Sequence, residues 1–267
     1  MTLDILICSF NKGIVRIDDI ISASRPNVTY IISYQYTDER YLDLIPRSVT
    51  ARDDVHLYAY KGQGLSNNRN HALSKSTADL VIYADDDTKL SEEAFEQIFD
   101  IFTRNPQLDV ALFRASTYTG KLLKNYPLEE REVRNIPEDY AISTIEMVFR
   151  RDKVQGIIRF DERFGLGTKF LTCGEERIWL VDALRQNLRI KYFPIRIIET
   201  STMLKQSMIY VDAGVQRSKG AFTYYLHGKM AWWYCFVFAF NCTRRGLCHF
   251  FPMLRHLFQG IRYLQRH

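Results

Sequence analysis

Short apolar runs alternate with polar loops and helical patterns over the first third of the chain. Runs of strand length that are rich in apolar, β-branched and aromatic residues predict strands at residues 3–8, 28–34, 55–60 and 80–84, of which 80–84 is continuously apolar. A helical pattern over residues 14–23 separates the first two of these strands. Strands that alternate with helices are typical of βαβ units, so we expect an α/β domain with a mostly parallel central sheet.

The middle of the chain carries further helix and strand patterns. Ser66 and Ser91 each stand at a position suited to capping a helix, and another helix is predicted after Gly174. Apolar residues at 110–113 and 144–149 predict later strands. With 267 residues, of which 46% are hydrophobic, the chain can bury a substantial core.

Charge divides the chain into two parts. Asp212 is the last acidic residue, and eight Lys or Arg residues follow it, so residues 213–267 carry +8 while the whole chain carries +5. We therefore predict one α/β domain over residues 1–212 and a basic, aromatic helical tail over residues 213–267. Such a tail is attracted to polyanions, either nucleic acid or the cytoplasmic face of a membrane.

Aromatic content favours the membrane over nucleic acid. Residues 230–240 are strongly apolar but fall short of the roughly 20 residues that cross a bilayer. A helix beginning near Pro252 places basic residues on one face and apolar residues on another, which is typical of peripheral membrane proteins. The apolar face comprises Leu254, Leu257, Phe258, Ile261 and Leu264. No nucleic-acid partner is expected, because the aromatic residues cluster in one block. The alternative is that both segments cover the catalytic domain or form a dimer contact.

The location expected from these patterns is the cytoplasm. The N-terminus enters the first strand directly, without the basic and apolar regions of a signal peptide. Combined with the tail, this predicts a peripheral protein on the inner face of the cell membrane.

Three consecutive aspartates, Asp85, Asp86 and Asp87, follow the apolar run 80–84. Carboxylates this close repel one another, which raises the pKa of one or more of them unless a cation is present. Mg²⁺ or Mn²⁺, bound by one or two carboxylates and by phosphate oxygens, removes that conflict. Ligands of open α/β sheets bind at the carboxyl ends of strands. The alternative is a hydrated acidic turn before the next helix.

Two glycine turns carry further candidate chemistry. The stretch from Gly62 to Asn70 combines a turn, a helix start and the guanidinium of Arg69, which suits a phosphate or a carboxylate. Glu175 and Glu176 follow the second turn, and a carboxylate there can act as a general base. Each motif has a structural alternative: Arg69 as the partner of an aspartate, and the glutamates as complements of a helix dipole.

The order of these motifs resembles that of a family 2 glycosyltransferase of the GT-A fold, of the type that builds bacterial polysaccharides. The resemblance covers residues 3–201. Its parts are Ser9-Phe10-Asn11 after the first strand, Gly64-Leu65-Ser66-x-x-Arg69-Asn70, Ala84-Asp85-Asp86-Asp87, Phe160-Asp161-Glu162-x-Phe164-Gly165 and Gly174-Glu175-Glu176. It implies a Rossmann-like sheet flanked by helices and a nucleoside-diphosphate sugar donor, with UDP as the expected nucleotide.

Residue roles follow from the same resemblance. Asp87 is implied as a ligand of Mn²⁺ or Mg²⁺, and Asp85 as a contact to the metal or the ribose. Glu176 is the implied base, with Glu175 as the second choice. The remaining residues implied near the donor are Ser9, Phe10, Asn11, Gly64, Arg69 and Asp86.

The sequence departs from the family pattern at two places. The second strand of the family ends in an acidic motif that meets the base, whereas here the first carboxylate is Asp38. Residues 197–201 lack the histidine that is often near the metal. Both departures concern ligand contacts, and neither changes the expected fold.

The expected activity is that of an inverting, metal-dependent hexosyltransferase with a saccharide or lipid-linked acceptor. The sequence leaves two alternatives. One is a sugar nucleotidyltransferase, for which residues 8–13 are a poor match to the expected glycine-rich signature. The other is a non-catalytic module that binds nucleotide sugars at a membrane.

Overall fold

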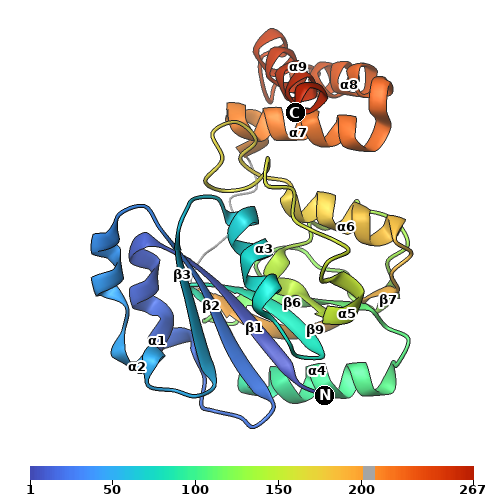
Figure 1. Ribbon diagram of the computed structural model, residues 1–267. Coiled ribbons are helices and arrows are strands. Elements are labelled where there is room, and N and C mark those ends of the chain that lie inside the picture. The colour runs from blue at the N-terminus through green and yellow to red at the C-terminus, as the bar shows by residue number, and fades with distance from the viewer. Residues whose placement is uncertain (201–207) are drawn as a thin grey trace. The chain divides into compact units, whose positions relative to one another are not determined.

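The computed structural model of the protein describes residues 1–200 and 208–267. These residues form two compact units (Figure 1). The first unit comprises residues 1–63, 67–160 and 179–200, and the second comprises residues 64–66, 161–178 and 208–267. Ser201, the last residue of the family resemblance, lies outside the described residues.

The first unit is built on a sheet that, among the described residues, contains nine strands in the order β3-β2-β1-β4-β8-β6-β9-β5, with β7 paired to β9. The strands are β1 Leu3–Phe10, β2 Val28–Tyr36, β3 Val55–Lys61, β4 Leu80–Asp85, β5 Thr88–Leu90, β6 Val110–Thr117, β7 Arg131–Glu132, β8 Met147–Arg150 and β9 Ile190–Thr200. β1 is parallel to β2 and β4, β2 to β3, and β6 to β9. β8 runs antiparallel between β4 and β6. The predicted α/β class with a mostly parallel sheet is confirmed.

Helices flank this sheet (Figure 1). Those before α6 are the 3₁₀ helices η1 Asn11–Arg16, η2 Glu39–Leu44 and η3 Thr144–Glu146, and the α-helices α1 Ile17–Ile20, α2 Arg47–Thr50, α3 Leu65–Lys75, α4 Glu92–Arg104 and α5 Arg151–Val154. α4 buries an apolar stripe that includes Phe95, Ile98 and Phe102 against the sheet. α6, Glu175–Arg185, begins in the second unit and continues into the first.

The second unit contains the C-terminal helices η4 Met208–Tyr210, α7 Ala213–His227, η5 Gly228–Met230, α8 Ala231–Arg244 and α9 Phe250–Arg266. α7 and α9 meet at two glycines. A Cβ at Gly220 would lie 2.0 Å from the carbonyl oxygen of Leu257, and one at Gly260 would lie 1.9 Å from that of Arg217. Only glycine permits backbones to approach this closely. No described helix is both long and apolar enough to cross a bilayer.

Several predicted boundaries differ from the structure. The helix expected over 14–23 is instead a 3₁₀ turn followed by the four-residue α1. Residues 144–146 form a 3₁₀ turn, so the strand begins only at Met147. Ser66 lies inside α3, and its hydroxyl donates to the carbonyl of Phe164 at 2.6 Å. Ser91 occupies the cap position of α4 without a side-chain capping bond.

Candidate functional site

The three aspartates stand where β4 ends. β1 and β4 are parallel neighbours with Cys8 opposite Asp85, so the carboxyl ends of both strands lie side by side. Thr88 closes the turn that follows, because its hydroxyl accepts from the Asp85 N–H at 2.8 Å and donates to the Asp85 carbonyl at 3.0 Å. All three aspartates are half-buried.

Asp86 is fastened to the chain that follows β1. The Arg16 guanidinium forms an ion pair with its carboxylate, and Arg16 Nε donates to its backbone carbonyl at 3.1 Å. Ser9 Oγ donates to Oδ2 of the same carboxylate at 3.2 Å. A Cβ at Gly13 would lie 1.7 Å from that Oδ2, so the 3₁₀ turn reaches Asp86 only with glycine at this position. The hydrogen bond to Asp86 raises the pKa of Arg16 above its ordinary value.

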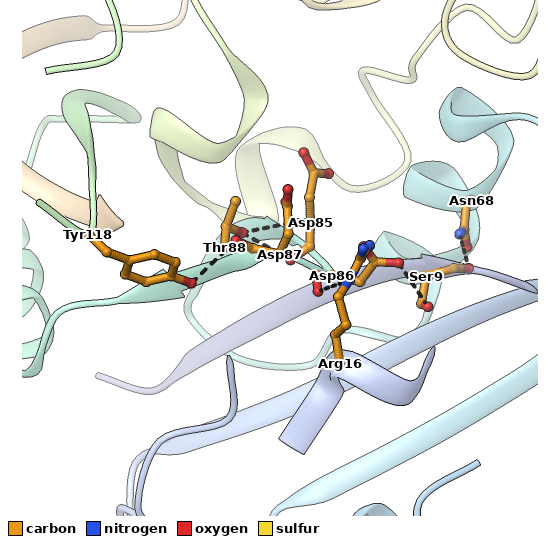
Figure 2. A network of polar contacts seen from close by, with 8 residues as sticks. All are labelled: Ser9, Arg16, Asn68, Asp85, Asp86, Asp87, Thr88 and Tyr118. Atoms are coloured by element: carbon orange, nitrogen blue, oxygen red, sulfur yellow. Dashed lines mark hydrogen bonds and ion pairs between the residues drawn. The ribbon is translucent and has the colours of Figure 1, made fainter. Parts of the chain in front are cut away.

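The side chains of the acidic turn point to different sides. Figure 2 shows the Asp86 carboxylate turned toward Ser9 and Arg16, while Asp85 and Asp87 point away from them. Tyr118 approaches the turn from β6's end and donates to the Asp87 carbonyl at 3.4 Å. Two of the three carboxylates thus share one side of the turn.

α3 brings a cation and an amide to the same strand ends. The Arg69 side chain is 4% exposed, and its Nη2 lies 3.8 Å from Oδ1 of Asp85. The guanidinium also covers the ring of Phe160 at 5.3 Å. Asn68, which is 2% exposed, donates to the Ser9 carbonyl at 3.1 Å, and its Oδ1 has no hydrogen-bond partner among residues 1–200 and 208–267. A buried acceptor of this kind costs free energy unless a ligand donor reaches it.

Aromatic and neutral polar residues lie around the carboxyl ends of β1 and β2. Asn11 adopts a φ of 47° and accepts from the Thr37 N–H at 2.9 Å, which joins the two strand ends. The ring of Phe10 is 43% exposed there. Gln35, 1% exposed, donates to Tyr60 Oη at 2.8 Å. These residues surround the strand ends with aromatic rings and neutral hydrogen-bonding groups.

Asp38, the first carboxylate after β2, caps η2. Its side chain accepts from the Arg40 N–H at 3.0 Å and from the Arg40 guanidinium. These hydrogen bonds lower the pKa of Asp38 to about 2. The carboxylate is therefore engaged within its own turn.

The remaining predicted residues lie in the second unit. Gly64 has a φ of 108°, and Gly174, just before α6, has a φ of 101°. Glu175 is 4% exposed, and Glu176 beside it is partly exposed. A Cβ at Gly165 would lie 3.0 Å from Ser66 Oγ and 3.2 Å from the Glu175 carboxyl carbon. The structure therefore gathers Ser66, Gly165 and Glu175 into one cluster.

A pocket of about 650 Å³ adjoins the acidic turn. Its charged and polar lining includes Arg16, Asp19, Asp86, Asp87, Lys89, Tyr118 and Glu199. Burial, followed by the charges of Asp87 and Glu199, raises the pKa of Tyr118. The pocket is predominantly acidic, which favours cationic ligands.

Within the described part of the chain, no three His, Cys, Asp or Glu side chains are grouped to hold a metal ion. A divalent cation at this turn would take at most two carboxylates from the protein, those of Asp85 and Asp87. This donor set of hard oxygens fits Mg²⁺ or Mn²⁺, which commonly take remaining ligands from phosphate and water.

Sequence patterns missed four residues of this site: Arg16, Asn68, Thr88 and Tyr118. A possible signal for Thr88 is its position directly after the acidic turn, since threonine often bonds to nearby backbone. Arg16 and Tyr118 reach the turn, and Asn68 reaches the end of β1, through folding of segments distant in the sequence, which no local pattern encodes.

Comparisons with known proteins agree with this architecture. Residues 15–166 match the model of the family described as glycosyl transferase family 2. The chain is also similar to the crystal structure of S. aureus TarS, with 16% identity and a TM-score of 0.56, over 84% of this chain and 40% of TarS. No curated protein sequence matches.

Two further TarS structures contain ligands. TarS 1–349 in complex with UDP is 15% identical, with a TM-score of 0.55, and is matched over 84% of this chain and 66% of its own. The corresponding complex with UDP-GlcNAc is 13% identical, with a TM-score of 0.54, over 84% and 67%. The likeness confirms the GT-A fold. Because the family model matches more than half of the chain, this protein belongs to glycosyl transferase family 2.

Proposed function

We propose that the protein transfers a sugar from a nucleoside-diphosphate sugar to a hydroxyl of a saccharide or lipid-linked acceptor, with inversion at the anomeric carbon. The observation that carries this proposal is the acidic turn at the end of β4, with Asp85 beside the buried guanidinium of Arg69. In a family 2 glycosyltransferase, such a turn at the strand ends suits a diphosphate held by a cation.

The donor proposed is a UDP-sugar. S. aureus TarS, which shares the fold, has been crystallised with UDP and with UDP-GlcNAc. In this chain the exposed ring of Phe10 offers a surface for a base, and the buried Oδ1 of Asn68 offers an acceptor for an N–H of the base. Ser9, Asn11 and Asp86 complete the proposed donor site in the first unit, and the family resemblance adds Gly64 as a further donor residue.

The metal belongs to the same proposal. Asp87, with Asp85, would hold Mn²⁺ or Mg²⁺. When bound, such an ion neutralises charge on the diphosphate leaving group. Arg69 adds a fixed positive charge on the same side, and its burial limits the screening of that charge by water.

Proton transfer is assigned to the first turn of α6. The acceptor oxygen forms its bond to the anomeric carbon as the bond from that carbon to the diphosphate breaks. The acceptor proton passes to the Glu176 carboxylate. Glu175 is the second choice, because it is more buried than Glu176 and lies against Gly165.

The proposed setting is the synthesis of a surface polysaccharide at the inner face of the cell membrane, with the basic tail as the membrane contact. The domain boundary at residue 212 is retained in this proposal. Residues 1–212 carry the donor and proton-transfer residues, and residues 213–267 carry the tail.

A panel of UDP- and GDP-sugars tests the proposal. Purified protein is mixed with each donor and with Mn²⁺ or Mg²⁺, without and with saccharide or lipid-linked acceptors, and thermal stabilisation and nucleotide release are measured. We expect one donor class to stabilise the protein in a metal-dependent manner and to release its nucleoside diphosphate. Binding without release under all acceptors tried would indicate a binding module, and absence of metal-dependent binding would overturn the assignment.

A further inference from the structure

An outward-facing apolar stripe runs along α8. The helix packs Ala231, Cys235, Ala239 and Cys242 against its neighbours. Trp233, Phe236, Val237 and Phe240 follow the spacing i, i+3, i+4 and i+7, on the side of the helix opposite to that buried row. Their exposure is high for apolar side chains: 60% for Trp233, 40% for Phe236 and 51% for Phe240.

The stripe continues onto the start of α9 through aromatic contacts. The rings of Trp233 and Phe236 stack at 5.9 Å, and Phe236 meets Phe250 edge-on at 5.6 Å. Phe250 in turn contacts Phe251 at 5.4 Å, and Phe251 is 79% exposed. One connected aromatic surface therefore spans two helices. Exposed aromatic patches of this size are uncommon on proteins without a partner for them.

Cations flank this aromatic surface. Lys229 is exposed just before α8, and Arg244 and Arg245 are exposed where the helix ends. Arg255, one turn after Phe251 on α9, is also exposed. From residue 213 onward the sequence contains no Asp or Glu to offset them. The partner that covers the surface must therefore accept both aromatic rings and positive charge.

We propose that this surface of α8 and α9 binds the interface of an anionic lipid bilayer, with Trp233, Phe236, Phe240 and Phe251 entering the headgroup region. Aromatic rings favour that depth, and each flanking cation contributes binding free energy through its attraction to anionic headgroups. α8 has 14 residues and is about 21 Å long, too short to cross a hydrocarbon core of about 30 Å. It therefore lies along the bilayer.

This inference gives the proposed membrane setting a defined contact surface, but its chemistry does not depend on sugar transfer. A binding assay without nucleotide keeps the two separate. If Asp87→Asn binds vesicles as the parent chain does while lacking transfer, each proposal has been tested by its own measurement.

The test uses the full chain and vesicles of phosphatidylglycerol mixed with phosphatidylcholine, or of phosphatidylcholine alone. Co-sedimentation measures binding at low and high salt. We expect binding to the anionic vesicles that weakens with salt. Trp233→Ser combined with Phe251→Ser should lower the affinity about tenfold or more. Each of Arg244→Gln and Arg245→Gln should lower it roughly fivefold at low salt.

Two controls exclude general effects. Leu128→Ser removes an 87% exposed leucine from the first unit and should leave binding unchanged. Of the other two tryptophans, Trp179 is 0% exposed and Trp232 packs on the ring of Phe258 at 4.6 Å, so a blue shift of tryptophan emission on vesicle binding that disappears in Trp233→Phe reports the α8 surface. Melting temperatures of all variants confirm folding.

Three outcomes would overturn the proposal. The first is that the parent chain does not bind anionic vesicles. The second is that folded Trp233→Ser, Phe251→Ser protein binds them equally well. The third is that the parent chain forms a dimer in solution that the same substitutions dissociate, without vesicle binding, which would assign the surface to a second copy of the chain.

Discussion

Arg16 pairs with the Asp86 carboxylate and donates to the Asp86 backbone carbonyl at 3.1 Å. One side chain thus fixes both the carboxylate and the peptide of the middle aspartate. The turn that contains Asp85 and Asp87 is thereby joined to η1. The backbone that carries these two carboxylates is therefore fixed in position. Exposure of 53% for the Arg16 side chain limits the contribution of this pair to global stability.

The first prediction separates the aspartates. Asp87→Asn should lower kcat/KM by about 10²-fold or more while the melting temperature stays the same, because it removes a proposed metal ligand and keeps the side-chain volume. Asp86→Asn weakens the contact with Arg16, so we expect a smaller loss, mainly in donor KM. Steady-state kinetics at several Mn²⁺ concentrations check both. Near-parental turnover by folded Asp87→Asn would remove this residue from the site.

The second prediction concerns the proton acceptor. Glu176→Gln should lower kcat by about 10²- to 10⁴-fold, because it removes the proposed proton acceptor, whereas donor affinity should persist. Glu175→Gln is the matched comparison, with the same chemical change one residue earlier. A loss of kcat of this size in Glu175→Gln, with near-parental kcat in Glu176→Gln, would transfer the role to Glu175.

The third prediction links His71 to the pH dependence of stability. Burial, with a smaller effect of Lys75, lowers the pKa of His71 below its ordinary value of 6.5. The unfolded chain therefore binds this proton more tightly, so stability should be complete above about pH 6.5 and should decrease as the pH falls below it. Urea unfolding of the parent chain and of His71→Gln at pH 8 and near pH 5.5 checks this.

His71→Gln should flatten that decrease. His56→Gln, which makes the same chemical change at an exposed position of β3, is measured in parallel as the matched variant. An identical pH dependence in the parent and in His71→Gln would contradict the assignment.

The fourth prediction tests the crossing of α7 and α9. Gly220→Ala or Gly260→Ala places a methyl group within about 2 Å of a backbone carbonyl, so the helices must separate. We expect a loss of at least about 1–3 kcal/mol, although alanine favours helix more than glycine does. Gln265→Ala, at an exposed position of α9, is the control. Chemical denaturation measures the difference, and unchanged stability of both glycine variants would contradict the prediction.

Sequence patterns located β1, β2, β4 and β6 well, because these strands are buried on both faces and so appear as largely apolar runs. β4 and the aspartates after it are the clearest case: the predicted run 80–84 and the observed Leu80–Asp85 differ by one residue. The turn after β1 was not predictable in the same way. Its 3₁₀ geometry depends on Asn11 at positive φ and on the distant Asp86.

The tail shows a second limit of periodicity. The pattern predicted a face of leucine, phenylalanine and isoleucine on the last helix, from Leu254 to Leu264. The structure buries Leu257 and Ile261 of that face and packs Leu254 and Phe258 partly against the same cluster, and it also buries Met253 and Gly260, which the pattern did not include. Because α7 contacts α9 at Gly260, the buried face of α9 includes this glycine. A hydrophobicity pattern cannot predict this, since glycine has no side chain.

The close contact between α7 and α9 also determines how the tail responds to a mechanical force applied at its end. Peptide groups meet there directly, so no rotamer can change to absorb a displacement, and interiors packed this closely transmit strain. A force applied to the end of α9 should therefore displace α7 and α9 together as one rigid body. The end of α9 is therefore a suitable attachment site for a rigid probe that reports the orientation of α7 and α9.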